Sequence, residues 1–377
     1  MKYIVTSMLL AACLSSCAED ISTSVSNDEY DRLYMANKEF VIYDSNLDGQ
    51  ISMADIDGIK NNGSKYKCKK LLTTHKVDSI SKANFIDSYQ TPEITINGKR
   101  VANVVYKSVG EERIMMDLFL PNSEDRPDGL TPIVLFFHGG GWRSGDKYII
   151  QGKGYQPIVD ELLKRGIAVA SVNYRFIING EQFVPTVVSD AKDAVAFIHR
   201  DGAQYGIDGE RVVVWGGSAG GHLSLMCGFT DVDSFPGDKA LSKWRQKPTG
   251  VVSWYGSGDF TLGSWEDAIA RGHETFYKCF TDSKETEELQ AKGFESAPLT
   301  HISSDDPHTI LFGGDADVIV SINDATQMYD KLQECGVKSE LIVVHGAGHG
   351  WSGKDFTPNK EQINRLTIES VLKIFNM

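Results

Sequence analysis

The chain has 377 residues, of which 41% are hydrophobic and 10% aromatic, a composition that is ordinary for a globular protein with a sizeable core. This length favours one large domain accompanied by a small one, and it leaves the oligomeric state open. The formal net charge is −13, and no part of the sequence offers the clustered basic surface that a polyanion needs for binding. Nucleic acid is therefore excluded as the expected partner, and small or sugar-based substrates are favoured.

The N-terminal segment is typical of an export signal. Residues 1–16 combine one lysine, an apolar run too short to span a bilayer, and small residues before Cys17. This pattern resembles a bacterial lipoprotein signal that is cleaved before Cys17, whose thiol is then acylated. Acylation at Cys13 and a simple secretory peptide are the alternatives. We therefore expect an exported protein of a Gram-negative bacterium, located in the periplasm or on the outer membrane or cell surface, with a lipid anchor as its only membrane attachment.

The next segment carries a calcium-binding pattern. Residues 17–29 are rich in Ser, Asp and Glu and predict a disordered tether. Residues 30–95 predict a small helical EF-hand-like pair, because the first loop spaces oxygen ligands at alternate positions and has a glycine at its sharp turn. The expected metal ligands are Asp44, Asn46, Asp48, Gln50 through its carbonyl, Ser52 through water, and Asp55.

Only the first of the two loops is intact. Aligning Ile80 with Ile51 places a second loop at residues 73–84, which has lost its early carboxylates and should pack without binding metal. Asp55 replaces the usual bidentate glutamate, so calcium binding should be weaker or more tolerant of magnesium. A polar turn without metal remains the alternative. Calcium is the only cofactor that the sequence indicates, and none is expected for catalysis.

From residue 96 to residue 377, strand and helix patterns alternate. Apolar or alternating strand patterns occupy residues 101–106, 114–120, 133–137 and 167–172. Helical patterns at residues 154–164 and 187–199 separate later strands, as a mostly parallel sheet flanked by helices requires. The sequence therefore predicts an α/β catalytic domain, with an aromatic-rich cap insertion at about residues 259–290.

A nucleophile motif lies in the middle of this region. The apolar strand at residues 212–215 leads into G-x-S-x-G centred on Ser218, and a helical pattern follows. Upstream, His138 begins an HGGG loop after a buried strand. The expected oxyanion-hole donors are the backbone N–H groups of Gly140, Gly141 and Ala219. We interpret His138 and His222 as structural residues.

The acid and the base are expected in the C-terminal third of the chain. In this type of site the acid follows the serine and precedes the histidine, and Asp317 is favoured over Asp315 because it fits a G-x-x-D-x-x-V turn. His349 lies on a glycine-rich loop after an apolar strand, where a base can reach the serine, whereas His345 is closer to the strand end.

The region from residue 100 to the C-terminus resembles the esterase branch of the α/β hydrolases that is related to hormone-sensitive lipase and to bacterial carbohydrate esterases. The matching motifs are Asp117–Pro121, His138–Trp142, Asn173–Arg175, Gly206–Asp208, Gly216–Leu223, Ser296–Leu299, Asp317–Val320 and Gly348–His349. The resemblance implies the α/β-hydrolase fold and a Ser218, Asp317 and His349 triad. Gly313 and Ser321 depart from the usual His and Pro of relatives, which affects the wall of the site and not the triad.

The expected function is carboxylic-ester hydrolysis through an acyl-enzyme. A small ester, or acetyl or feruloyl groups on plant oligosaccharides or polysaccharides, is the expected substrate by analogy with surface lipoprotein esterases. An amidase, peptidase or arylformamidase using the same triad is the enzymatic alternative. A calcium-dependent binding protein with an inert hydrolase fold is the alternative of another class.

Overall fold

The computed structural model describes residues 25–43, 48, 50–56, 68, 71–72, 77–125, 129–177, 182–260, 264–271 and 273–377. The chain divides into two compact units, Met1–Glu93 with Ser108–Arg113, and Ile94–Lys107 with Ile114–Met377. The export signal with Cys13 and Cys17 lies outside the described residues, as do Asp44 and Asn46, so lipidation stays a prediction. Among the described residues, no helix is both long and apolar enough to cross a membrane.

The first unit pairs two short strands between helices. Its elements are α2 (Asn27–Tyr43), β1 (Gln50–Ser52), the 3-10 helix η1 (Met53–Asp55), β2 (Ser79–Ser81) and α4 (Lys82–Ser88). Strands β1 and β2 are antiparallel, and Ile51 lies opposite Ile80. The sequence alignment of the two loops placed these same two residues at equivalent positions. The Phe85 ring contacts the rings of Phe40 and Tyr43, at centroid distances of 5.8 and 6.1 Å, and closes a small aromatic core.

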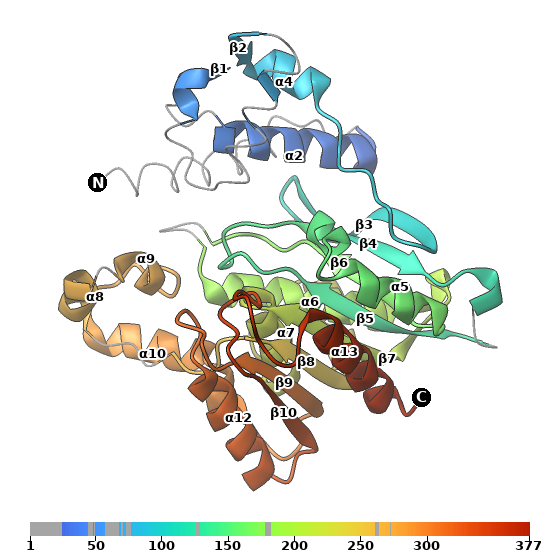
Figure 1. Ribbon diagram of the computed structural model, residues 1–377, viewed down its shortest axis with the longest axis vertical. Coiled ribbons are helices and arrows are strands. Elements are labelled where there is room, and N and C mark those ends of the chain that lie inside the picture. Colours follow the sequence, from blue (N-terminus) through green and yellow to red (C-terminus); the bar gives the residue numbers. More distant parts are fainter. Residues whose placement is uncertain are drawn as a thin grey trace. The chain divides into compact units, whose positions relative to one another are not determined.

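An eight-stranded sheet forms the centre of the second unit (Figure 1). Its strands are β3 (Lys99–Val109), β4 (Glu112–Leu120), β5 (Thr131–Phe137), β6 (Ala168–Val172), β7 (Ile207–Gly217), β8 (Gly250–Trp254), β9 (His308–Gly314) and β10 (Ser339–Val344). The strand order is β10-β9-β8-β7-β5-β6-β4-β3. The six strands from β10 to β6 run parallel to their neighbours, whereas β4 is antiparallel to β6.

Helices connect the parallel strands. The connecting helices are α5 (Gln156–Lys164) after β5, α6 (Val184–Asp201) after β6, α7 (Ala219–Phe229) after β7, α12 (Ile322–Glu334) after β9, and α13 (Lys360–Phe375) after β10. Helix α6 begins three residues before the predicted start at residue 187, because Pro185 fits the first turn of a helix, where no backbone N–H bond is required. The connection between β8 and β9 is different and contains α8 (Trp265–Arg271), α9 (Glu274–Tyr277), α10 (Thr286–Ser296) and α11 (Pro298–His301), in the region of the predicted cap.

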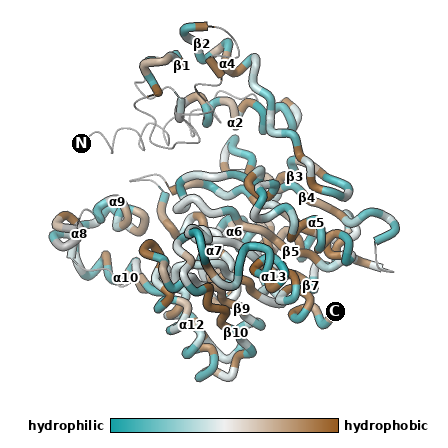
Figure 2. Tube along the Cα trace, viewed as in Figure 1, coloured by the Kyte–Doolittle hydropathy of each residue, from teal (hydrophilic) through white to brown (hydrophobic). Residues whose placement is uncertain are grey.

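The core explains why the central strands are continuously apolar. Alternate residues of four adjacent strands enter one hydrophobic cluster with α5 and α13, namely Val134, Phe136, Val213, Trp215, Val252, Trp254, Ile310 and Phe312. The intervening residues, such as Leu135 and Val214, are also fully buried. Both faces of the sheet are therefore covered, which is what a mostly parallel sheet requires. Figure 2 shows hydrophobic residues concentrated along strands such as β9.

Candidate active site

Ser218 lies at the turn between β7 and α7 in a strained conformation. Its φ of 57° and ψ of −121° are unusual for a residue with a side chain. A Cβ atom added to Gly220 would lie 1.9 Å from the carbonyl oxygen of Phe137, and one added to Gly216 would lie 2.5 Å from that same oxygen. Only glycine fits at these two positions, so the backbone can turn sharply there. The turn leaves the serine hydroxyl partly exposed at the end of the sheet.

The structure brings the three predicted triad residues together. His349 Nε2 lies 2.9 Å from Ser218 Oγ, and His349 Nδ1 lies 2.8 Å from Asp317 Oδ2. The other carboxylate oxygen of Asp317 accepts the backbone N–H groups of Ile319 and Val320, at 2.8 and 3.0 Å. The carboxylate is only 1% exposed and is held by its own loop. With the Nδ1–H tautomer, His349 donates to Asp317 and can accept the serine proton.

Asp315 and His345, the alternatives for the acid and the base, form a separate pair. His345 Nδ1 lies 2.8 Å from Asp315 Oδ2, and the His345 side chain is 71% exposed. The Asp315 carboxylate also accepts the backbone N–H of Gly346 at 2.6 Å. The hydrogen bond from this N–H group lowers the pKa of the Asp315 carboxyl below its ordinary value, and the hydrogen bond with His345 adds a smaller effect in the same direction.

The HGGG loop lies against the nucleophile turn. A Cβ atom at Gly139 would lie 3.6 Å from Ser218 Cβ. Gly140 and Gly141 have φ angles of +120° and +61°, and the Gly140 carbonyl accepts the N–H of Ser144 at 3.1 Å and its Oγ–H at 3.0 Å. Because a trans peptide points its two polar groups in opposite directions, the Gly141 N–H points away from Ser144. The third expected oxyanion donor belongs to Ala219, the first residue of α7.

Two histidines near the serine support loops. His222 is fully buried, accepts the indole N–H of Trp142 at Nδ1 (3.2 Å) and contacts the carbonyl of Ser296 through Nε2 (2.8 Å). Burial lowers the pKa of His222 to about 4, so it is neutral at pH 7. His138 is buried and its ring stacks on Tyr174, with centroids 4.3 Å apart. These contacts agree with the structural interpretation of both residues.

Aromatic rings pack behind the His349 imidazole, a feature that sequence reasoning missed. The Tyr255 ring lies 4.9 Å from the His349 ring and 4.6 Å from that of Trp351. Tyr255 is the first residue after β8, and burial raises its pKa well above the ordinary value, so its hydroxyl stays protonated. Positive φ angles of non-glycine residues gather around the site: 58° at Trp142, 57° at Ser218, 38° at Tyr255 and 56° at Trp351. Such strain is concentrated at functional sites in proteins.

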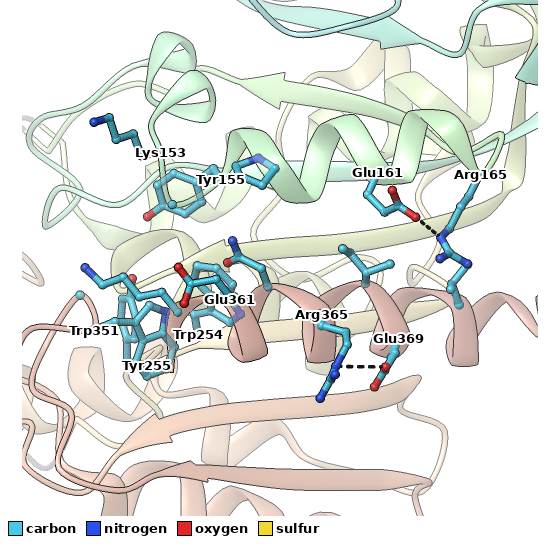
Figure 3. Close-up of a pocket in the computed structure, with 17 residues that line it drawn as sticks. Lys153, Tyr155, Glu161, Arg165, Trp254, Tyr255, Trp351, Glu361, Arg365 and Glu369 are labelled. Atoms are coloured by element: carbon cyan, nitrogen blue, oxygen red, sulfur yellow. Dashed lines mark hydrogen bonds and ion pairs between the residues drawn. The ribbon is translucent and has the colours of Figure 1, made fainter. Parts of the chain in front are cut away.

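A cavity of about 1060 Å³ lies between α5 and α13 (Figure 3). Tyr155, Trp254, Tyr255 and Trp351 line one end of it, and charged and apolar side chains of the two helices line much of the rest. In the part of the chain that the structure describes, none of the three triad residues lines this cavity. The cavity therefore neighbours the base without containing the reacting atoms.

The cap contributes an aromatic cluster beside the oxyanion loop. Phe260 contacts Phe280 at a centroid distance of 4.8 Å and Trp142 at 6.0 Å, and Phe276 contacts Phe280 at 5.2 Å. Trp265, Tyr277 and Phe280 are buried and serve the packing of the cap, whereas Phe276 is 39% exposed. Phe276 is thus the one of these four cap residues that a ligand can reach.

The predicted calcium loop is described only in part. Asp48 is exposed and accepts the backbone N–H of Gln50 at 2.9 Å. Asp55 is buried and its Oδ2 accepts the N–H and Oγ–H of Ser52, at 2.7 and 3.0 Å, which caps helix η1. Among the described residues there is no group of three His, Cys, Asp or Glu side chains suited to a metal. Calcium binding stays a prediction, because it depends on residues outside this part.

Comparison with known proteins matches the catalytic region to a family and to curated relatives. The family model described as BD-FAE matches residues 116–332. A probable isoprenylcysteine alpha-carbonyl methylesterase of Oryza sativa, ICMEL1, is 30% identical over 258 residues, which cover 66% of this chain and 56% of the relative. The probable carboxylic ester hydrolase LipM of Mycobacterium tuberculosis is 29% identical over 219 residues, covering 55% of this chain and 47% of the relative. The chain spans about half the length of these relatives.

Solved structures of similar fold include esterase 2 of Thermogutta terrifontis. Its sarin-phosphonylated form has a TM-score of 0.60 and 21% identity, covering 76% of this chain and 98% of the other. The native form has a TM-score of 0.58 and 23% identity, covering 72% of this chain and 91% of the other. At this level of identity the similarity establishes the fold, which is the α/β-hydrolase fold expected from the sequence.

The close approach of Gly220 to the carbonyl oxygen of Phe137 leads to a testable prediction. Alanine is a better helix former than glycine by about 1 kcal/mol, so Gly220→Ala in α7 should stabilise the protein if space allowed. The contact with the Phe137 carbonyl reverses this expectation. We expect a loss of about 1–3 kcal/mol in the free energy of unfolding, measured by urea denaturation, because the backbone must shift.

Gly154→Ala is the matched control, because a Cβ atom there meets nothing within 4 Å. Its free energy of unfolding should change by no more than about 0.5 kcal/mol. Equal stability of the two alanine variants would contradict the steric explanation of the turn.

Proposed function

The chain belongs to the BD-FAE family, an esterase family of the α/β-hydrolase fold, and we propose that it hydrolyses carboxylic esters through an acyl-enzyme on Ser218. The observation that carries this proposal is the continuous hydrogen-bonded path from Ser218 Oγ through His349 to Asp317. Names of curated relatives, such as the esterase LipC of Mycobacterium tuberculosis, support the same class of reaction.

In the first half of the proposed mechanism, the serine is acylated. His349 Nε2 takes the proton of Ser218 Oγ as this oxygen attacks the ester carbonyl carbon. The carbonyl oxygen becomes an oxyanion that accepts hydrogen bonds from the N–H groups of Gly140, Gly141 and Ala219. His349 then donates its proton to the leaving oxygen, the bond between that oxygen and the acyl carbon breaks, and the alcohol departs.

The second half releases the acid. His349 takes a proton from water, whose oxygen attacks the acyl carbon, and the Ser218 oxygen leaves and regains the proton. Asp317 does not exchange protons in either half. Its carboxylate fixes the Nδ1–H tautomer and stabilises the imidazolium that forms in each transition state. The hydrogen-bonded Ser218, His349 and Asp317 support these assigned roles.

Substitution of the nucleophile and of the acid tests this mechanism. We expect Ser218→Ala and Asp317→Asn to lower kcat for p-nitrophenyl acetate by about 10³-fold or more, because these groups act as one unit. Ser242→Ala, which removes an exposed hydroxyl in the 3-10 helix η5 (Lys239–Trp244), is the matched control and should leave kcat unchanged. Full activity of Ser218→Ala would show that another group carries the reaction.

We further propose that the acyl group is acetyl or feruloyl, esterified to a plant polysaccharide. The cap supports an aromatic acyl group, because the exposed ring of Phe276 adjoins the Phe260 and Phe280 rings beside the oxyanion loop. An aromatic acyl group stacks favourably on such rings, whereas an acetyl group has no ring to stack. The predicted export signal would place the enzyme where such polymers occur.

Release of acids from decorated xylan and pectin tests the proposed substrate. We expect ferulate and acetate release by the wild type and none by Ser218→Ala. Phe276→Ala should lower the rate of ferulate release about two- to tenfold, because this factor corresponds to the free energy of one aromatic contact, and should leave acetate release unchanged. Phe294→Ala is the control, because this ring is 65% exposed and lies on α10. Cleavage of p-nitrophenyl acetate without release from any glycan would contradict the polysaccharide proposal.

We also propose that the first loop of the N-terminal unit binds calcium. The antiparallel pairing of Ile51 with Ile80 supports this proposal, because EF-hand loops that bind as a pair are joined by such a bridge. Asp48 and Asp55 would serve as ligands on either side of β1. The ion would stabilise this unit and would take no part in ester hydrolysis.

Thermal unfolding tests the calcium proposal. Calcium at 100 times its Kd should stabilise the wild type by about 2.7 kcal/mol and raise the Tm relative to chelator. Asp48→Ala should lose this increase. Asp78→Ala in the degenerate loop should keep it, because that exposed residue is not an expected ligand. A wild-type Tm that is the same in calcium and in chelator would show that the loop binds no calcium.

A further inference from the structure

We propose that Asp315 and His345 form a positioning pair that holds the His349 loop against the Asp317 loop. The proposal rests on the esterase function above and assigns a role to a second Asp–His pair that takes no part in proton transfer. Asp315 lies two residues before the proposed acid, and His345 lies four residues before the proposed base. Each member of the pair is therefore on the same loop as one member of the triad.

The pair lies where the backbone pairing of β9 and β10 ends. The last paired residues of these parallel strands are Gly314 and Val344. Beyond them, the Asp315 N–H donates to the Val344 carbonyl at 3.3 Å, and the Ala316 N–H donates to the Ala347 carbonyl at 3.1 Å. After these contacts, the segments that follow β9 and β10 separate into the loops that carry the acid and the base. The backbone hydrogen bonds between these two loops thus reach Val344 and Ala347, the residues on either side of His345 and Gly346.

The Asp315 side chain adds a connection at the two residues that lie between Val344 and Ala347. Oδ1 accepts the backbone N–H of Gly346 at 2.6 Å, and Oδ2 lies 2.8 Å from His345 Nδ1. One side chain of the acid loop therefore holds two consecutive residues of the base loop. His345 is held from its other side as well, because its backbone N–H and carbonyl pair with those of Thr357 at 2.7 and 3.0 Å. The strand end that leads to His349 is thereby fixed on both sides.

The surroundings of the pair indicate positioning and not global stability. The Asp315 and His345 side chains are 38% and 71% exposed, and exposed ion pairs contribute little to the stability of a fold. A displacement of the base by about 1 Å, in contrast, can reduce catalysis about 100-fold. Removal of the pair should therefore act on kcat far more than on unfolding.

The geometry also argues against Asp315 and His345 being a second catalytic dyad. Ser218 Oγ is within hydrogen-bonding distance of His349 Nε2, and the ring of His345 is directed to Asp315. The Asp315 carboxylate, whose pKa lies below its ordinary value, is ionised at neutral pH and can accept both hydrogen bonds when His345 is protonated or in its neutral Nδ1–H tautomer. The connection between the loops therefore persists throughout the neutral pH range.

Four variants test the proposal. Asp315→Ala removes both contacts and should lower kcat for p-nitrophenyl acetate about 10- to 100-fold, with KM changed less than about twofold and Tm lowered by less than about 3 °C. His345→Ala should show a smaller loss of the same kind. His345→Asn should restore activity, because the amide nitrogen can donate near the position of Nδ1. Asp355→Ala, which removes an exposed aspartate of the base loop, should match the wild type.

A spectroscopic measurement separates this proposal from the esterase proposal. The proton on His349 Nδ1, hydrogen-bonded to a buried carboxylate, gives a downfield proton resonance that is identified by its loss in His349→Ala. We expect Asp315→Ala to shift or broaden this resonance and Asp355→Ala to preserve it, whether or not any ester is hydrolysed. An unchanged resonance in Asp315→Ala would overturn the proposal, and so would a loss of kcat accompanied by a large fall in Tm.

Discussion

The parallel pairing of the central strands is the constraint on which the site depends. Because β5, β7, β8, β9 and β10 run in one direction, their carboxyl ends meet at one edge of the sheet. The oxyanion loop, the nucleophile turn, Tyr255, the acid loop and the base loop each follow one of these ends. The side chains of Ser218 and His349, which are distant in the sequence, therefore come within 2.9 Å of each other.

Close backbone contact then determines the local geometry. The nucleophile turn packs so tightly on the end of β5 that Gly216 and Gly220 have no room for a side chain. Strain at Ser218, Tyr255 and Trp351 persists because the surrounding packed structure holds these residues in place. The rigid core beneath α5 and α13 thus supports a set of loops whose positions matter to within about 1 Å, the precision that catalysis demands.

Sequence reasoning identified the parts of the site that carry local patterns. The strand-turn-helix around Ser218 and the glycine-rich loop at His349 have recognisable spacing, and the choice of Asp317 over Asp315 agrees with the hydrogen bonds. Strand β8 and Tyr255 were missed, because a five-residue apolar run without a motif gives little signal. The pairing of Asp315 with His345 was missed for another reason: the two residues were considered only as rivals for the triad.

Contacts between residues that are far apart in the sequence could not be predicted either. Trp142 donates to His222, 80 residues away, and Lys107 forms buried ion pairs with Asp190 and Asp193 at 2.7 Å. Nothing in the spacing of these residues indicates a partner, because the contact exists only once the sheet and α6 have assembled. The cap is an intermediate case, since its aromatic composition was visible in the sequence and the exposure of Phe276 was not.

Covalent labelling of the nucleophile is the most direct test of the proposed chemistry. The folded protein would be incubated with a fluorophosphonate, and the adduct would be located by intact mass and peptide mapping. An activated serine predicts one adduct per chain, on the peptide that contains Ser218, and no adduct in Ser218→Ala. An unlabelled wild-type protein, or an adduct on another residue, would contradict a serine hydrolase centred on Ser218 and would favour a binding protein with an inert hydrolase fold.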